Sequence, residues 1–423
     1  MTATPAPAER PASVPSSSRP DWRTPGVIVL AGCLIAMVSF GPRSAMGFFT
    51  NEMSVDRGWA LAVFSLSAAI QNILWGIGQP FAGALADRFG VTRVLVVGAV
   101  LYALGLVWMA HATDPFSLHM SAGVLIGFGL AGCSFNLVLA AFGKLLPLSW
   151  RPMALGAGSA AGSFGQFLFA PLTVFLKGAI GWEATLMLFG AAMLIVLPLS
   201  VVLMTPRAEE PAGTPSADET QTLKAALAEA FGHRSYNLLV AGFFVCGFHL
   251  AFITIHLPKY LVDHGISTTI GGWVMALIGL FNLAGSLLAG YWSGKVSKPY
   301  LLSAIYLARS ALIVGFVLLP LTPWTALAFG AGIGLLWLST VPPTSGLVLV
   351  MFGPRWMAML FGVVFLSHQI GSFLGVWLAG LLYDSTGSYD VVWWLGVALG
   401  LFAALVHLPI QEQPVARATP AST

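Results

Sequence analysis

Long apolar runs separated by short polar segments dominate this chain. Twelve of the runs are long enough to cross a bilayer as helices, which takes about 20 apolar residues each. Glycine or proline interrupts several of them, as in membrane helices that pack closely or bend. The runs cover about 25–49, 59–84, 91–111, 118–143, 152–176, 182–204, 236–260, 269–292, 299–320, 323–351, 357–382 and 390–408. The pattern predicts an all-α integral membrane protein with twelve transmembrane helices.

Polar segments divide these runs into two groups of six. The longest internal one, residues 205–235, contains a Pro- and Glu-rich stretch and then a short amphipathic helix predicted on the membrane surface. It separates an N-terminal half, 25–204, from a C-terminal half, 236–408. Two polar tails flank the halves at 1–24 and 409–423, and the first is expected to be disordered. Six plus six is the layout of two related halves with a binding site between them.

Composition supports the membrane assignment. Hydrophobic residues make up 57% of the chain and charged residues 8%, a balance that excludes a soluble globular protein. No basic cluster indicates nucleic-acid binding. The three cysteines lack the spacing of a metal site, so no cofactor is predicted. The sequence also lacks a nucleotide-binding Gly-rich loop and a nucleophile–base pair, which argues against an enzyme or an ATP-driven pump.

The distribution of lysine and arginine predicts the orientation. With both termini inside, fourteen of these residues fall in inner segments and three in outer loops, as the positive-inside rule requires. The inner residues are Arg10, Arg19, Arg23, Arg88, Arg93, Lys144, Arg151, Arg207, Lys224, Arg234, Lys295, Lys298, Arg355 and Arg417, and the outer ones are Arg57, Lys177 and Lys259. The remaining two, Arg43 and Arg309, lie within spans. The protein is expected in the plasma membrane, in a bacterium the inner membrane, with cytoplasmic termini, acting as a monomer.

Arg43 lies in the first apolar run, within the segment Phe40–Phe49. A charged residue at the centre of a membrane helix costs about 2.5–3.5 kcal/mol, so such residues mark functional sites by default. Pro42 and flanking glycines indicate a bent helix beside a water-filled cavity. There a guanidinium would select an anion, ideally a planar carboxylate. The alternative is that Arg43 extends to the outer membrane surface, since it lies near that end of the predicted span.

Histidines are the titratable candidates deeper in the spans, because no Asp or Glu falls in the middle of any span. His249 and His368 are predicted to bind substrate or exchange protons, and Gln369 to bind substrate beside His368. His249 takes the place in the seventh span that Arg43 takes in the first. His256, two turns further on, is a weaker candidate near the outer end. For His249 and His256 a role in helix packing is the alternative.

Arg309, in the middle of the ninth span, has two interpretations. It contacts the substrate, or it makes a structural hydrogen bond to a carbonyl or to Asn282. Asn136 in the fourth span is predicted to line the cavity. Gln71, Asn72, Asn136 and Gln166 can alternatively join helices by hydrogen bonds.

A loop motif joins the second and third spans. The stretch Gly83–Arg93 reads Gly-Ala-Leu-Ala-Asp-Arg-Phe-Gly-Val-Thr-Arg, and a degenerate copy follows the eighth span at Gly290–Lys298. It resembles the signature loop of the major facilitator superfamily. That resemblance implies that Gly83, Asp87, Arg88, Gly90 and Arg93 form a gate between two rocking halves, and it implies the major facilitator fold. The alternative is that Asp87 and Arg88 only flank helix ends.

Two further stretches resemble the monocarboxylate transporter family and the related oxalate–formate exchanger. They are Pro42-Arg43-Ser44, where the family has Pro-Lys-Ser, and the small-residue run Arg151–Gly165 leading to Pro171. Departures are a reduced opening motif at Asp21-Trp22, and Asn282 and Ser286 where the family has aspartate and arginine. In the exchanger a lysine of the eleventh span binds substrate, which implies an anion contact for His368.

The predicted function is a secondary transporter of a small organic anion, a monocarboxylate, by proton symport or exchange for a counter-anion. One alternative is a multidrug or toxic-compound exporter of the same superfamily. A further alternative is a sensor built on a transporter scaffold. Exporters of cationic drugs typically need a carboxylate in the membrane, and none is visible in the spans.

Overall fold

The structure, a computed structural model, describes residues 22–147, 149–204, 222–353 and 356–415. The side chains of Asp87, Pro152, Ser159, Leu223 and Ala358 are also outside the description. Almost all of the predicted N-terminal tail, much of the linker and the last part of the C-terminal tail therefore lie outside the described residues. Within the described ranges every regular element is a helix. This confirms the all-α prediction.

Six spans form the N-terminal half, and three of them are built from more than one helix. The first span consists of α1 (Pro25–Ser44), η1 (Met46–Phe49) and α2 (Thr50–Arg57), and the second and third are α3 (Leu61–Phe89) and α4 (Val91–Ala110). The fourth consists of α5 (Pro115–Leu118), the π-helix η2 (His119–Leu125), α6 (Ile126–Gly132) and α7 (Phe135–Leu145). The fifth is α8 (Arg151–Ile180), and the sixth consists of α9 (Trp182–Met193) and α10 (Val196–Val202).

The C-terminal half follows a short separate helix, α11 (Leu223–Gly232), which lies where the sequence predicts a surface helix. Its spans are α12 (Arg234–Asp263), α13 (Thr268–Ser293), α14 (Lys298–Leu318), α15 (Pro323–Leu335) with α16 (Val341–Phe352), α17 (Met357–Thr386) and α18 (Asp390–His407). Within the described residues, eleven helical segments are long and apolar enough to cross a membrane. The tenth predicted span is the broken pair α15 and α16, so the twelve-span pattern is confirmed.

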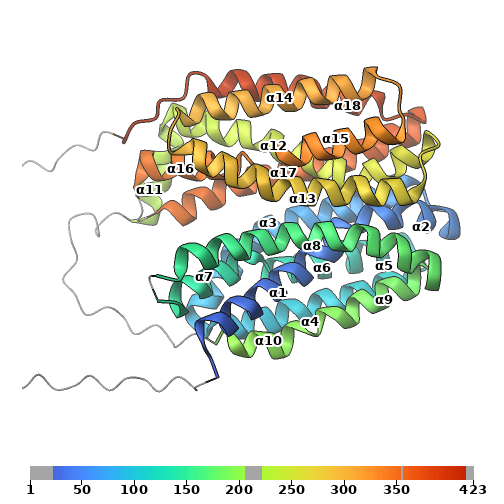
Figure 1. The fold of residues 1–423 in the computed structure, drawn as a ribbon, viewed down its shortest axis with the longest axis horizontal. Coiled ribbons are helices and arrows are strands. Elements are labelled where there is room, and N and C mark those ends of the chain that lie inside the picture. The colour runs from blue at the N-terminus through green and yellow to red at the C-terminus, as the bar shows by residue number, and fades with distance from the viewer. Residues whose placement is uncertain (1–21, 148, 205–221, 354–355, 416–423) are drawn as a thin grey trace, which may run out of the picture.

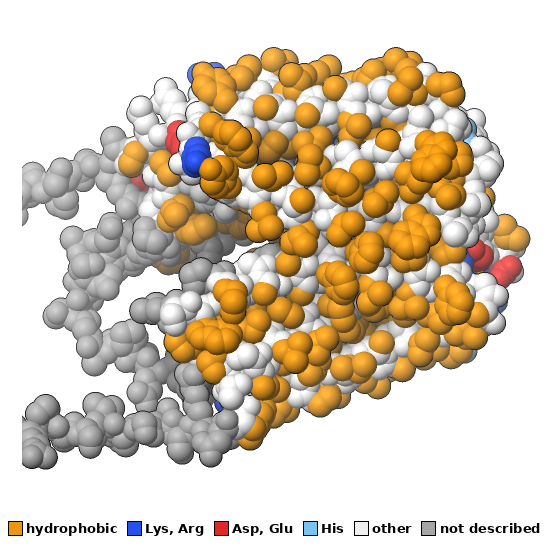
Figure 2. Space-filling model, in the orientation of Figure 1, with side chains coloured by type: hydrophobic (Ala, Val, Ile, Leu, Met, Phe, Trp, Pro, Cys, Tyr) orange, Lys and Arg blue, Asp and Glu red, His pale blue; other side chains and the backbone are white. Residues whose placement is uncertain are grey.

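Each half has its own apolar core. One core consists mainly of side chains from α1 to α10, and the other mainly of side chains from α12 to α18. Figure 1 shows the two halves side by side, one blue to green and the other yellow to red. Figure 2 shows hydrophobic side chains over most of the visible face, with charged side chains near its ends. A broad apolar face of this kind suits a lipid environment, where burial from water is not needed.

The halves meet closely at the end opposite the termini. A Cβ atom on Gly47 of η1 would lie 2.5 Å from the Thr254 carbonyl oxygen of α12; nearer the middle of the spans, one on Gly279 of α13 would lie 2.6 Å from the Phe167 nitrogen of α8. Only glycine permits such an approach of two backbones. Ala45 and Phe48 of the first span even belong to the core of the C-terminal half.

Toward the terminal end, where α1 begins and α18 ends, the same interface helices separate. A Cβ added to Gly83 on α3, Gly156 on α8 or Gly362 on α17 would have no atom of another described element within 4 Å. Figure 1 shows the ribbons of the two halves diverging on the side where α1 begins. The two halves of the described chain therefore pack closely at one end, and their helices diverge toward the other.

The first span extends further than the sequence indicates. The predicted end is Phe49, whereas the helical segment continues to Arg57. After α1 ends, the chain makes the 3₁₀ turn η1, where the Phe48 N–H bonds the Ala45 carbonyl at 3.0 Å, and helix then resumes. Because the span is longer, Arg43 lies near its middle rather than near its outer end.

Candidate functional site

Arg43 points from the first span toward α3. Its Nη2 donates a hydrogen bond to Asn72 Oδ1 at 2.7 Å. Its Cζ lies 4.5 Å from the ring centroid of Trp75 and 5.7 Å from that of Phe40, which are distances of cation–π contact. Its Nε is buried and has no hydrogen-bond partner among the described residues. The guanidinium is thus held in place while part of its donor capacity stays free.

The charge of Arg43 has no protein counter-ion in the part of the chain that the structure describes. The ion pairs found there join Arg57 to Glu183, Lys177 to Glu52, Lys259 to Asp263 and Lys298 to Glu412. All of these acids lie near helix ends or beyond them. An unneutralised guanidinium away from bulk water favours an anionic ligand.

Two aromatic rings connect Arg43 to the other half. The Trp75 ring meets the Phe365 ring of α17 edge to face, with centroids 5.5 Å apart, and Phe365 stacks on His368 at 5.7 Å. Trp75 Nε1 donates to Gln79 Oε1 at 3.0 Å. We call the pair Trp75 and Phe365 the aromatic wall. It brings Arg43 and His368, from opposite halves, to the same region.

Gln369 adds a second free donor on the α17 side. It is fully buried, and its Oε1 lies 3.1 Å from His368 Nδ1, which must donate because an amide oxygen only accepts. Its Nε2 is buried without a partner among the described residues. The Gln369 side chain also packs against Gly76, where a Cβ would lie 2.7 Å from it. Since Gly76 follows Asn72 by one helical turn, about 6 Å, the contacts of Arg43 and Gln369 lie on one face of α3.

A small cavity adjoins this region. Phe40 and Trp75, which flank Arg43, line it together with Ser39, Ser134 and residues of α1, α6 and α7. Its volume is about 10 Å³, enough for roughly one water molecule. A larger groove of about 510 Å³ lies between α8 and α13 near the opposite end. Its lining is apolar apart from Thr269, so it offers no charge to a solute, and we place the candidate site at Arg43.

His249 is not brought to the aromatic wall. Its Nε2 donates to the Gly396 carbonyl of α18 at 2.7 Å, and the side chain is 1% exposed. The ring lies between α12 and α18 inside the C-terminal half. His256 is likewise enclosed, bonded to the Tyr389 hydroxyl at 3.1 Å and the Val376 carbonyl at 3.0 Å. The predicted roles of His249 in substrate and proton binding stay predictions.

Arg309 lies at the break in the tenth span. It is fully buried and donates from Nε to the Leu336 carbonyl at 3.0 Å and from Nη2 to the carbonyls of Leu336 and Trp337. These carbonyls follow α15 and have no continuing helix to bond. The contacts match the structural interpretation of Arg309. They do not bring it to the aromatic wall.

Asn282 braces the same break and also reaches the other half. Its Oδ1 accepts from the Leu338 N–H at 3.0 Å, and its Nδ2 donates to Ser163 Oγ of α8 at 2.9 Å. This residue stands where the resemblance implies an aspartate. Here it joins helices instead of carrying charge.

Among the described side chains, no hydrogen bond or ring contact joins Asn136 or the loop between α3 and α4 to the aromatic wall. Asn136 is exposed on the second residue of α7. In the loop, Arg88 and Arg93 are exposed, and Gly90 has φ +90°, a conformation that L side chains rarely adopt. The predicted gate residue Asp87 has its side chain outside the described part. The gating role of Gly83, Asp87, Arg88, Gly90 and Arg93 therefore remains a prediction.

Sequence reasoning missed the aromatic wall. Trp75 and Phe365 are two of many aromatic residues, and nothing in their local sequence distinguishes them. The available signal was that Trp75 follows Asn72 by three residues, so both lie on one helix face. Their meeting with Arg43 and Phe365 depends on how three spans pack.

Comparisons with known proteins agree with this architecture. The family model described as Major Facilitator Superfamily matches residues 28–376. An uncharacterized MFS-type transporter, YcxA of Bacillus subtilis, is 27% identical over 91% of this chain and 94% of its own length. Human monocarboxylate transporter 11 is 27% identical over 92% of this chain and 83% of its own length.

Solved structures show the same fold. A bacterial homologue of the human lysosomal transporter Spinster superposes with a TM-score of 0.73 at 17% identity, over 92% of this chain and 97% of that one. The D-xylose–proton symporter superposes with a TM-score of 0.71 at 16% identity, over 91% and 97%. With a family model that covers most of its length and transporters among its relatives, this chain belongs to the major facilitator superfamily.

Proposed function

We propose that this protein carries a small organic anion, a monocarboxylate, across the membrane by alternating access of one site to the two sides. The observation that carries the proposal is Arg43, a mid-span guanidinium with a free buried Nε and no counter-ion among the described residues. A carboxylate would complete its hydrogen bonds and neutralise its charge. The relatives named monocarboxylate transporters support the same substrate class.

The surroundings suit a short acid. The carboxylate would accept hydrogen bonds from Arg43, and the carbon skeleton would contact the aromatic wall. Gln369 Nε2 and His368 stand on the opposite half, so a bound anion would contact both halves at once. A ligand that touches both halves can couple its binding to their relative movement.

Orientation and coupling follow from charge. Because lysine and arginine concentrate on the side of the termini, we place that side in the cytoplasm, which is the side toward which the helices of the two halves diverge. The membrane would be the bacterial inner membrane and the working unit a monomer. Coupling would use a proton carried by His368 or an exchanged anion, since the described spans hold no central carboxylate.

Transport by purified protein in liposomes tests the proposal. Vesicles preloaded with lactate, pyruvate, oxalate or formate would take up the labelled anion with and without an inward proton gradient. Wild type would be compared with Arg43→Ala, and with Arg57→Ala, which removes another arginine of the same span that pairs with Glu183. We expect uptake by wild type and Arg57→Ala, and loss in Arg43→Ala.

The outcomes separate the alternatives. Uptake stimulated by the proton gradient means symport, and uptake only against a preloaded anion means exchange. Normal uptake by Arg43→Ala would contradict the assigned site. Failure of wild type to move any carboxylate would contradict the substrate class and favour the exporter alternative.

A further inference from the structure

At the end opposite the termini, one carboxylate of the C-terminal half contacts the start of a helix in the N-terminal half. The Leu61 N–H donates to Asp384 Oδ1 at 3.0 Å, and the Ala62 N–H donates to Asp384 Oδ2 at 2.7 Å. Leu61 and Ala62 are the first two residues of α3. Both oxygens of a side chain on α17 thus bind the N-terminus of a helix in the other half.

The helix α3 has no cap of its own. The first N–H groups of a helix lack partners within it, and a Ser, Thr, Asp or Asn at the preceding position normally accepts from them. In α3 that position is Ala60, which makes no side-chain hydrogen bond. Its backbone is extended, with φ −60° and ψ 148°, so the local geometry would suit a capping residue. Asp384 supplies the capping carboxylate that the sequence before α3 lacks.

Asp384 is unfavourably placed in its own helix. It lies in the last turn of α17, which ends at Thr386, and a negative charge near a helix C-terminus is disfavoured by the helix dipole. The N-terminus of α3 has the opposite polarity and offsets this cost. The contact with the other half therefore gives the carboxylate its favourable environment.

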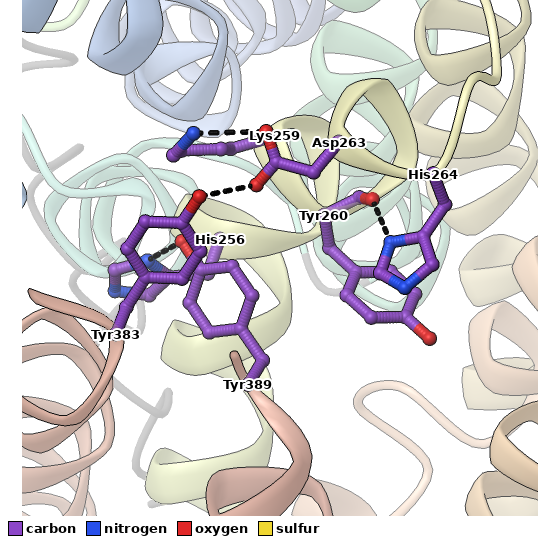
Figure 3. Close-up of polar contacts among 7 residues, drawn as sticks. All are labelled: His256, Lys259, Tyr260, Asp263, His264, Tyr383 and Tyr389. Atoms are coloured by element: carbon purple, nitrogen blue, oxygen red, sulfur yellow. Dashed lines mark hydrogen bonds and ion pairs between the residues drawn. The ribbon is translucent and has the colours of Figure 1, made fainter. Parts of the chain in front are cut away.

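The neighbouring residue anchors the same turn of α17 within its own half. Figure 3 shows Tyr383 directed at Asp263 of α12, with a hydrogen bond of 2.8 Å to Asp263 Oδ2. Lys259 donates to the other oxygen, Oδ1, at 2.9 Å. Tyr383 thus ties the end of α17 to α12, while Asp384, next in sequence, reaches α3.

We propose that Asp384 is an interdomain latch that caps α3 only while the end opposite the termini is closed. When the halves separate there, α17 moves with α12 through Tyr383, and α3 loses its cap. The latch favours the state seen in this structure over the alternate one. It rests on the alternating access of the family and not on which solute is carried.

Exposure of a buried position between α3 and α17 tests the latch. Ser65 is fully buried, and a Cβ on Gly380 of α17 would lie 2.3 Å from its Oγ. In purified protein carrying Ser65→Cys, the rate at which a water-soluble maleimide labels the new thiol would be measured. The labelling of the native cysteines, measured in the protein without Ser65→Cys, would be subtracted. Adding Asp384→Ala is expected to speed labelling about tenfold, the size of losing a helix cap. An unchanged rate would overturn the proposal.

A second variant separates a latch from a simple cap. Ala60→Asp in the Asp384→Ala background returns a cap to α3 from its own chain but not the tie between halves. We expect the melting temperature to recover while labelling of the Ser65→Cys thiol stays fast. Recovery of slow labelling would overturn the latch, because capping alone would then explain Asp384. Ser385→Ala, which removes a hydroxyl bonded only within α17 among the described residues, should leave both readouts unchanged.

Discussion

The two arginines within the spans, Arg43 and Arg309, have different hydrogen-bond partners. Arg309 is fully buried; its Nε and Nη2 bind the carbonyls that the break in the tenth span leaves open, while its Nη1 has no partner among the described residues. Arg43 makes one hydrogen bond to Asn72, stacks on Trp75 and keeps its buried Nε free among the described residues. The Arg309 guanidinium bonds two backbone carbonyls at a helix break, whereas the Arg43 guanidinium bonds one side-chain amide and lies against an aromatic ring.

The difference shows that the free-energy cost of a charged side chain in a membrane span does not tell whether that side chain is structural or functional. Both residues carry the same burial penalty in the sequence. What separates them is the acceptor, which for Arg309 is backbone carbonyl at a helix break and for Arg43 is the Asn72 side chain, with an anionic substrate as the proposed further acceptor. The following variants test this contrast, beginning with the largest expected effect.

Arg43→Ala should reduce the transport rate and leave the stability of the folded protein nearly unchanged. Removing one partner of a desolvated charge pair costs about 2–5 kcal/mol, so kcat/KM for the anion should fall at least about 30-fold. The melting temperature should change little, because Arg43 has one hydrogen bond to lose. Uptake kinetics in liposomes and thermal unfolding of the same preparation check this. A folding defect equal to the transport defect would contradict the contrast.

Arg309→Leu should mainly lower the stability of the folded protein. It orphans the carbonyls of Leu336 and Trp337, at about 1–3 kcal/mol each, while removal of a buried charge offsets part of this. We expect a net loss of about 2 kcal/mol and a lower melting temperature. Arg309→Gln, which keeps an amide donor, serves as control and should lose less. A stable Arg309→Leu protein that cannot transport would assign Arg309 to the substrate.

Asn72→Asp should weaken anion binding while leaving Arg43 in place. The new carboxylate would lie at hydrogen-bond distance from the guanidinium and neutralise it before the substrate arrives. We expect KM to rise about tenfold, a change of about 1.4 kcal/mol. Asn72→Ala, which removes the hydrogen bond and adds no charge, should raise KM less. Equal effects of the two variants would show that charge at Arg43 is not what binds the solute.

Trp75→Leu should give the smallest effect. It removes the cation–π contact with Arg43, worth about 0.5–2 kcal/mol, and the edge-to-face contact with Phe365. KM is expected to rise about three- to tenfold. Trp75→Phe keeps a ring but loses the hydrogen bond to Gln79, so it should fall between wild type and Trp75→Leu. A Trp75→Leu protein with unchanged KM would remove the aromatic wall from the site.

Much of the architecture follows from the sequence because it depends on local composition. A run of about 20 apolar residues forms a membrane helix wherever it occurs, so the twelve spans and the two halves follow from counting. Counting lysines and arginines likewise isolates Arg43 and Arg309 as the exceptions. The loop at Gly83–Arg93 indicates the superfamily to which the chain belongs.

The roles within the spans depend on contacts between distant segments. The sequence pattern ends the first span at Phe49, since the polar residues after it hide a helix that continues to Arg57. His249 meets Gly396 and Arg309 meets Leu336 through packing that no short pattern records. Helices in lipid have no polar face turned to water, so periodicity does not tell which side faces a cavity. That choice is made when the spans pack together and pair their few polar groups.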